Sequence, residues 1–414
     1  MIALKKILAL VLAILFLVPL AAGCAKSSPP LETDESNDLA MSNEPIMDPL
    51  TLNQVGFDFA FFRSVASQDQ FANVVLSPIS AKIALAMAYN GASGEAREAM
   101  AKVLQLEGLD LDQVDNTFHD LIASLEQADP KVELEIADSL WANNFDFYPE
   151  FLARCQDYFG AEANQLDFSD PKTVDAINAW VSDKTKGKIE GIINKLDPED
   201  LFVLLNAVYF NGKWQKAFDK QDTSDQDFHL ADGSVGKVPM MKQDGELSYF
   251  ENDNYQAVRL PYGDGRLGMY VFLPREGKDL KGLIENINAG DWSEWMKGFK
   301  DRKGHIGLPR FKVEYSKTLN NTLISMGMGP AFEGNAFQAM APIDGLFIDK
   351  VMQKTYIDVN EEGTEAAAVT GVIVGVTAIR PDDSFKMTVD RPFLFAITDS
   401  ATQSILFMGS IVNP

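Results

Sequence analysis

Histidine and cysteine are scarce in this chain, which has three of the former and two of the latter. The histidines, His119, His229 and His305, lie in no recognisable catalytic setting, and a serine hydrolase needs a base beside its nucleophile. The sequence also has no His-Glu-x-x-His motif, no Cys-x-x-Cys pair and no glycine loop suited to a phosphate. We therefore expect no enzyme activity, no metal and no cofactor.

The two cysteines, Cys24 and Cys155, leave little scope for disulfide bonding. If Cys24 is lipidated, Cys155 has no intramolecular partner, and the fold must rely on packing for its stability. Cys155 lies within residues 149–159, whose apolar side chains have helical spacing. This pattern favours a buried structural thiol over a nucleophile.

Positive charge is also in short supply, because 36 Lys and Arg residues face 60 Asp and Glu residues, for a formal net charge of -24. Such a chain is repelled by nucleic acid and by anionic lipid headgroups. We expect no nucleic-acid partner, and basic or neutral proteins are better candidates.

The first 23 residues have the features of an export signal. Lys5 and Lys6 precede an apolar stretch over residues 7–18, which is shorter than the roughly 20 residues of a membrane span. Small residues directly before Cys24 resemble the bacterial lipobox, in which this cysteine is lipidated. We expect a cell-surface or outer-membrane lipoprotein anchored through Cys24; the alternative is cleavage near Ala22 and a secreted, extracellular protein.

The remaining chain divides into a tether and a body. Residues 24–48 are rich in Ser, Pro, Asp, Glu and Asn, a composition that predicts a disordered acidic tether. Residues 49–414 contain no Pro/Gly/Ser-rich break and no repeat, so we expect one large domain, with a monomer as the default state.

Periodicity predicts helices first and strands later in the body, an α+β arrangement. The expected helices cover residues 79–89, 95–104, 111–125 and 171–186. The apolar run at 201–210 predicts a strand buried on both faces of a large sheet. Further strands are expected at residues 256–260, 268–273, 312–315, 355–359, 393–398 and 405–411.

Residues 361–370, Glu-Glu-Gly-Thr-Glu-Ala-Ala-Ala-Val-Thr, predict a spare β-strand. After Glu365 no charge occurs until Arg380, and Glu365 lies on the face opposite to a row of small or apolar residues. A slip of one residue would bury that carboxylate at a cost of several kcal/mol, so the register is specified. The pattern suits conditional insertion into a sheet. The row comprises Thr364, Ala366, Ala368, Thr370, Val372 and Val374.

The same tract resembles the reactive-loop hinge of the serpins, and four further segments resemble serpin motifs in family order. They are residues 73–80, 205–214, 389–397 and 405–414. The likeness extends from about residue 48 to residue 414. It implies the serpin fold, with three β-sheets, eight or nine helices and an exposed mobile reactive loop at about 361–385. With the lipobox, the chain resembles a bacterial lipoprotein-type member.

The resemblance implies a suicide inhibitor of serine proteases, in which loop cleavage, acyl-enzyme trapping and loop insertion follow one another. Counting from Glu361 places the reactive bond at Thr377-Ala378, with one bond to either side as alternatives. Small and β-branched residues around it favour elastase-like or subtilisin-like proteases, which have small or apolar specificity pockets. The hinge residues are Glu361, Glu362, Gly363, Thr364, Glu365, Ala366, Ala367 and Ala368.

The resemblance also assigns residues to the opening of the central sheet. Ser77, Ser80 and Asn206 resemble residues beneath the point where the sheet parts, and Trp214 resembles the tryptophan above it. Gln353 stands where many members have a histidine, so we expect opening to be independent of a histidine pKa. The alternative function is a non-inhibitory serpin acting as a binding protein or chaperone, although such members tend to have charged, bulky or proline residues in the hinge.

Overall fold

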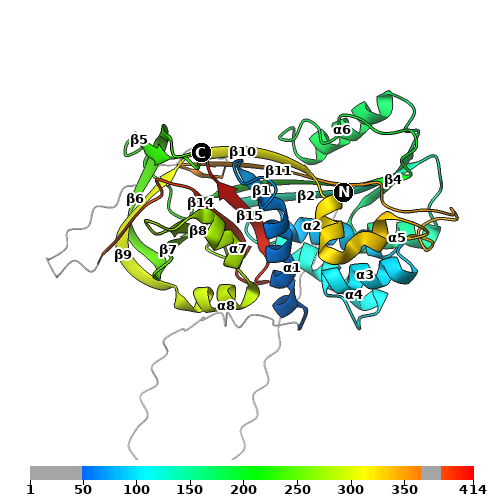
Figure 1. Cartoon of the computed structure of the whole chain (residues 1–414), viewed down its shortest axis with the longest axis horizontal. Coiled ribbons are helices and arrows are strands. Elements are labelled where there is room, and N and C mark those ends of the chain that lie inside the picture. The colour runs from blue at the N-terminus through cyan, green and yellow to red at the C-terminus, as the bar shows by residue number, and fades with distance from the viewer. Residues whose placement is uncertain (1–48, 365–383) are drawn as a thin grey trace, which may run out of the picture. The chain divides into compact units, whose positions relative to one another are not determined.

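The structure is a computed structural model that describes residues 49–364 and 384–414 (Figure 1). The leader, the tether with Cys24, the hinge residues Glu365, Ala366, Ala367 and Ala368, and the bond Thr377-Ala378 lie outside the described residues. In the part of the chain that is described, no helix combines the length and apolar character that a membrane crossing requires.

A six-stranded sheet carries the features that matter for function, and its central strand is β4. The sequence predicts this strand as buried on both faces, and the prediction is confirmed. β4 pairs antiparallel with β2 on one side and parallel with β11 on the other. The strands in order are β10 (Phe311–Thr318), β11 (Lys350–Asn360), β12 (Gly363–Thr364), β4 (Phe202–Lys213), β2 (Val132–Asn143) and β3 (Glu162–Leu166).

The other described strands form a nine-stranded sheet. Its long strand β6 pairs with β5 and β9 and, at its last four residues, also with β7. β6 therefore joins two groups of strands by hydrogen bonds, so that the three expected sheets form two continuous ones. The strands are β1 (Val74–Leu76), β15 (Ile405–Ile411), β14 (Phe393–Asp399), β8 (Leu267–Pro274), β7 (Tyr255–Pro261), β6 (Val235–Glu251), β9 (Lys300–Pro309), β13 (Phe385–Thr388) and β5 (Ser224–His229).

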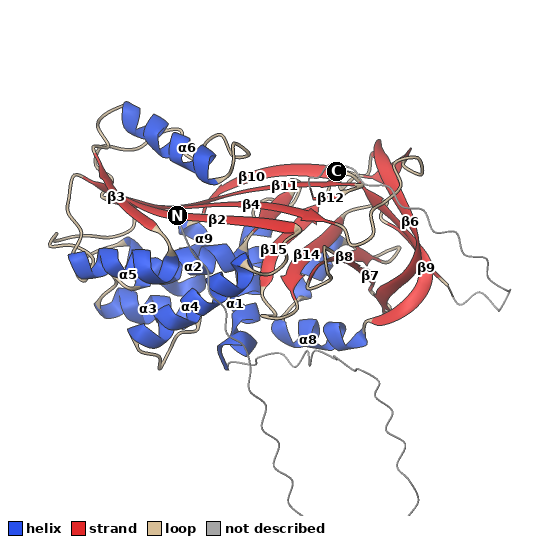
Figure 2. Ribbon diagram, turned by 180° about the vertical axis from the view of Figure 1, so that it is seen from behind, coloured by secondary structure: helices blue, strands red, loops and turns tan. Residues whose placement is uncertain are grey.

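Helices cover both faces of the six-stranded sheet, as Figure 2 shows: α2, α3, α4 and α5 lie on one side and α6 on the other. The described residues contain nine α-helices, which agrees with the expected number. They are α1 (Pro49–Ala66), α2 (Pro78–Tyr89), α3 (Gly94–Leu104), α4 (Leu111–Glu126), α5 (Pro149–Phe159), α6 (Lys172–Lys184), α7 (Leu280–Asn286), α8 (Ala289–Gly298) and α9 (Asn320–Leu323).

The start of α2 is set by local chemistry. The Ser77 hydroxyl accepts a hydrogen bond from the Ser80 backbone N–H, and Pro78 occupies the first turn, where its missing N–H costs nothing. Every residue of α2 is buried, because the helix lies between the two sheets and the other helices. This cap brings the N-terminus of α2 against the six-stranded sheet.

Alternate residues of β4 belong to two apolar cores. Phe202, Leu204 and Val208 face the large core beneath α2, whereas the intervening residues pack with Trp141 and Ile177 in a smaller core under α6. Cys155 is buried in the large core, as expected, and burial raises the pKa of its thiol to about 12. At neutral pH this cysteine is a protonated packing residue and no nucleophile.

Candidate functional site at the parting of the six-stranded sheet

The six-stranded sheet parts between β4 and β11. The two strands pair in parallel over seven positions, from Lys350 opposite Val203 to Tyr356 opposite Tyr209. Beyond Tyr356 they separate, and β12 lies between them, antiparallel to both. Thr364 is paired with Val359 of β11 and with Gly212 of β4. Gly363 and Thr364 of the predicted spare strand therefore already occupy the sheet.

Gly363 passes through the narrowest point of this entrance. Its φ of 147° lies in the region that favours glycine, and an added Cβ would come within 2.1 Å of the Gly212 carbonyl oxygen. The clash is with main chain and could not be relieved by a side-chain rotation. Thr364, which follows, is fully buried, and its hydroxyl lies 3.0 Å from the Tyr262 hydroxyl. Only a residue without a side chain fits before Thr364.

Two aromatic rings lie at the end of the sheet where β12 enters between β4 and β11. Trp214 and Tyr262 stack with ring centroids 4.4 Å apart and an interplanar angle of 12°. The Trp214 indole N–H donates to the Asn360 carbonyl at 2.9 Å, and its backbone N–H donates to the Glu362 carbonyl at 3.0 Å. Trp214 thus ties the end of β11 to the segment that contains Glu362. Burial raises the pKa of Tyr262, which stays protonated.

A buried polar network, called the lower network below, lies further from Trp214, where β4 and β11 are still paired. The Gln353 amide accepts from the Ser77 backbone N–H at 3.0 Å and donates to the Ser77 carbonyl at 2.9 Å and to Asn206 Oδ1 at 2.6 Å. The Asn206 amide in turn donates to the hydroxyl of Ser80. The structure therefore brings Ser77, Ser80, Asn206 and Gln353 together in one cluster. Gln353 uses both donor and acceptor, as we expect for an amide replacing an imidazole.

The sequence of the chain matches a known family. A family model described as Serpin (serine protease inhibitor) matches residues 52–414. The chain belongs to the serpin family. Members are in general protease inhibitors and not catalysts, although the family also includes thyroxine-binding globulin.

Individual serpins resemble the chain over most of their length. A serpin-like protein of Thermococcus kodakarensis is 38% identical over 364 residues, 86% of this chain and 84% of the relative. Leukocyte elastase inhibitor A of Mus musculus is 32% identical, over 89% of this chain and all of the relative. Among solved structures, native tengpin, a thermophilic serpin, has a TM-score of 0.83 at 33% identity, covering 89% and 95% of the two chains. Human thyroxine-binding globulin complexed with thyroxine has a TM-score of 0.81 at 26% identity, covering 88% and 98%.

The two hinge glutamates of this serpin are anchored to the body. Glu361 is buried; its carboxylate accepts from the Thr223 hydroxyl at 2.8 Å and lies 3.5 Å from the Arg310 guanidinium. Glu362 forms an ion pair with Lys220. These contacts hold the chain at Glu361 and Glu362, and the pairing of Gly363 and Thr364 with β4 and β11 continues this attachment.

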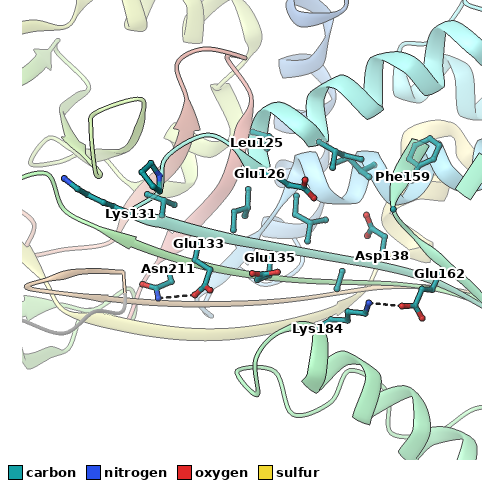
Figure 3. A pocket seen from close by; sticks show the side chains of 18 of the residues that line it. Leu125, Glu126, Lys131, Glu133, Glu135, Asp138, Phe159, Glu162, Lys184 and Asn211 are labelled. Carbon is teal, nitrogen blue, oxygen red and sulfur yellow. Dashed lines mark hydrogen bonds and ion pairs between the residues drawn. The ribbon is translucent and has the colours of Figure 1, made fainter. Parts of the chain in front are cut away.

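Asp138 is a member of the lower network that sequence reasoning missed. It is buried on β2, and its carboxylate accepts from the Asn206 amide. Burial raises the pKa of Asp138 to about 7, and the hydrogen bond from Asn206 lowers it only in part. In Figure 3 the Asp138 side chain projects from β2 toward Phe159, into a cavity of about 780 Å³.

The sequence contained a signal for Asp138. Along β2, Leu134, Ile136 and Leu140 alternate with residues of the opposite face, and Asp138 occupies a position of this apolar row. A carboxyl group in a row of core residues indicates a special environment. The sheet opening of this serpin therefore contains a titratable group even though the histidine is replaced by Gln353.

Proposed function

We propose that this serpin is a suicide inhibitor of serine proteases, in which the cleaved reactive loop inserts between β4 and β11. The observation that carries the proposal is the position of β12, which already occupies the entrance between these strands in the uncleaved chain. Insertion of the loop would therefore extend an existing strand, and no new strand pairing would have to start.

The pairing of β12 specifies how that strand would continue. Thr364 pairs with Gly212 and Val359, and each further residue moves one position along both neighbours. Six residues further, Thr370 would lie between Asn206 and Gln353. Insertion would thus separate the amides that now bond at 2.6 Å. The Thr370 hydroxyl could then bond to both in their place, which keeps these buried groups satisfied.

The same count places the end of the inserted strand. Ten residues after Thr364, Val374 would reach Phe202, the first residue of β4. The proposed bond at Thr377-Ala378 would then lie three residues beyond the sheet, and a protease acylated on Thr377 would be drawn to the end opposite Trp214. At roughly 3.3 Å per residue this displacement is on the order of 40 Å.

The exchange of pairings favours insertion. The seven parallel positions between β4 and β11 are lost, and antiparallel ladders form on both sides of the new strand. Antiparallel pairing is slightly more stable per residue than parallel pairing, and the number of ladders doubles. The small residues of the hinge fit this path because they can pass between packed strands without a bulky or charged group to bury.

The proposal is tested by incubating the protein with elastase-like, subtilisin-like, chymotrypsin-like and trypsin-like proteases. We expect a denaturant-resistant complex with the first two, and a released peptide whose mass begins at Ala378. Thr364→Arg should convert the inhibitor into a substrate, because Thr364 is fully buried between two strands. Gln127→Arg, at an exposed position, is the matched control. Clean cleavage with no complex in the unaltered protein would favour the binding-protein function.

A non-inhibitory function is the second candidate, since the solved structures resembling this chain include thyroxine-binding globulin. Heating separates the two. After loop cleavage an inhibitory serpin should gain greatly in melting temperature because the sheet acquires a central strand, whereas a passive binding module should not.

We also propose that the protein is exported, anchored to a membrane through a lipidated Cys24 and monomeric, with secretion as the alternative. The leader sequence supports this, with its two lysines, its short apolar stretch and the small residues before Cys24. Mass measurement of the mature N-terminus is the test. An acylated residue 24 supports the anchor, and an N-terminus at residue 23 or an unmodified Cys24 supports secretion.

A further inference from the structure

A second concave site lies on another part of the body, between the C-terminal half of α1, α7, the turn after β5 and the end of β15. Its volume is about 890 Å³, within the range of small-molecule sites in proteins. It shares no lining residue with the sheet opening. The apolar residues that line it include Ala60, Phe71, Leu230, Ile284, Met326 and Val412.

The groove leaves an unusual amount of apolar surface in contact with water. The side chain of Phe71 is 80% exposed, the largest fraction for any large apolar residue in the described chain. Ile324, which is 44% exposed, directly precedes the lining residues Ser325 and Met326. Covering Phe71 would remove most of an aromatic side chain from water, which favours binding of an apolar group. Apolar surface gathered around a hollow indicates a binding site.

The rim of the groove is positive although the chain as a whole is strongly negative. Arg63, Lys278, Lys281 and Arg391 line it, against only two carboxylates, Asp279 and Glu285. Both carboxylates have partners already. Asp279 accepts from the Gly282 backbone N–H at 2.6 Å at the start of α7, and Glu285 lies 3.8 Å from Lys281. A third carboxylate, that of Asp390, borders the rim and pairs with Arg391 at 2.6 Å. Four cations therefore stand against three carboxylates, which leaves an excess of one positive charge for an anionic group in the groove.

Two of these cations are held in place by the main chain. Arg63 donates to the Ile287 carbonyl at 3.0 Å, and Arg391 donates through Nε to the Pro274 carbonyl at 2.9 Å. Arg391 also pairs through Nη1 with Asp390. Guanidinium groups fixed in this way lose little side-chain entropy on binding an anion, and the remaining N–H groups of Arg63 match the geometry of a carboxylate.

We propose that this groove binds a small amphipathic anion, with an apolar body over Phe71 and Ile284 and one carboxylate among the rim cations. A protein partner would need on the order of 800 Å² of matching surface, and it would usually meet a flatter interface. The concave shape favours a small molecule. The excess of cations selects an anionic head group over a neutral one. The proposal is independent of the inhibitory function, because it uses none of the residues of the sheet opening.

Titration calorimetry with decanoate tests the proposal, with decanol as the uncharged counterpart of the same chain length. The protein is the full-length chain. At pH 7.5 we expect one decanoate site per chain and binding of decanol weaker by about tenfold or more. Phe71→Ser and Lys281→Glu should each weaken decanoate binding by about fivefold or more.

Matched variants far from the groove serve as controls. Leu152→Ser removes an exposed apolar side chain of α5, and Lys102→Glu reverses an exposed charge of α3. Both should bind decanoate as the unaltered protein does. Equal affinity for decanol, equal losses in the control variants, or no binding at about 1 mM decanoate would each overturn the proposal. Circular dichroism of Phe71→Ser and Lys281→Glu verifies that a loss of binding is not a loss of fold.

Discussion

Replacing Asp138 by asparagine should abolish a pH dependence that the sheet opening builds into the native state. The carboxyl group of Asp138 is buried and bonded to the Asn206 amide, and its pKa is raised to about 7 from an ordinary value of 3.8. Asparagine has nearly the same shape and keeps an acceptor for Asn206, but it cannot ionise. The substitution therefore removes the charge with little change in packing.

The sign of the effect follows from proton linkage. Between pH 3.8 and about 7 the folded chain retains the Asp138 proton that the unfolded chain releases, so the free energy of unfolding falls as the pH rises. Above about pH 7 the penalty is complete and constant. The shift corresponds to at most about 4 kcal/mol, and relaxation around the carboxylate makes about 1–3 kcal/mol the expected value at pH 8.

Urea unfolding of the uncleaved protein, followed by tryptophan fluorescence at pH 5, 6, 7 and 8, measures this difference. The midpoint of Asp138→Asn should exceed that of the unaltered protein by a margin that grows up to about pH 7 and then stays level. Asp157→Asn, an exposed carboxylate of α5, should follow the unaltered protein throughout. Parallel pH profiles for Asp138→Asn and the unaltered protein would refute the reasoning.

Three further substitutions test the path of the loop. Gly363→Ala should lower the free energy of unfolding by about 2 kcal/mol, because its Cβ would clash with the Gly212 carbonyl oxygen. An unchanged urea midpoint would show that the main chain at this position has room for a side chain. Tyr262→Phe removes the hydroxyl beside Thr364 and should cost about 1 kcal/mol in the same assay, with no loss if that contact is unimportant. Thr370→Val should leave the uncleaved protein unaltered and lower the stability of the cleaved form by about 1–3 kcal/mol, measured by denaturant unfolding after proteolysis; an effect only before cleavage would disprove the insertion register.

Much of the fold was predictable from local pattern. The apolar run at 201–210 is β4, the strands expected at 256–260 and 268–273 are β7 and β8, and Cys155 is buried in a helix. Each depends on neighbours in sequence or on the burial that a residue's own chemistry requires. β2 was not predicted, although Glu133 and Glu135 alternate with apolar residues in the pattern of a half-buried strand.

The motifs also predicted which residues belong to the opening, but not how they meet. Ser77, Asn206 and Gln353 are far apart in sequence, and their shared network exists only because α2 is capped against the sheet where β4 and β11 pair. The participation of Asp138 follows from the same pairing, since β2 lies on the other side of β4.

The sequence by itself determined that residues from Thr364 onward suit a strand, because small residues alternate there without charge. Only the tertiary structure decided where that strand enters and in which register. Gly363 pairs with Lys213 and Asn360, residues that are distant from one another in the chain. If the proposed insertion continues this pairing, Thr370 would meet the amides of Asn206 and Gln353. Strand register depends on backbone hydrogen bonds between distant segments, and no local pattern of side chains encodes which segments those are.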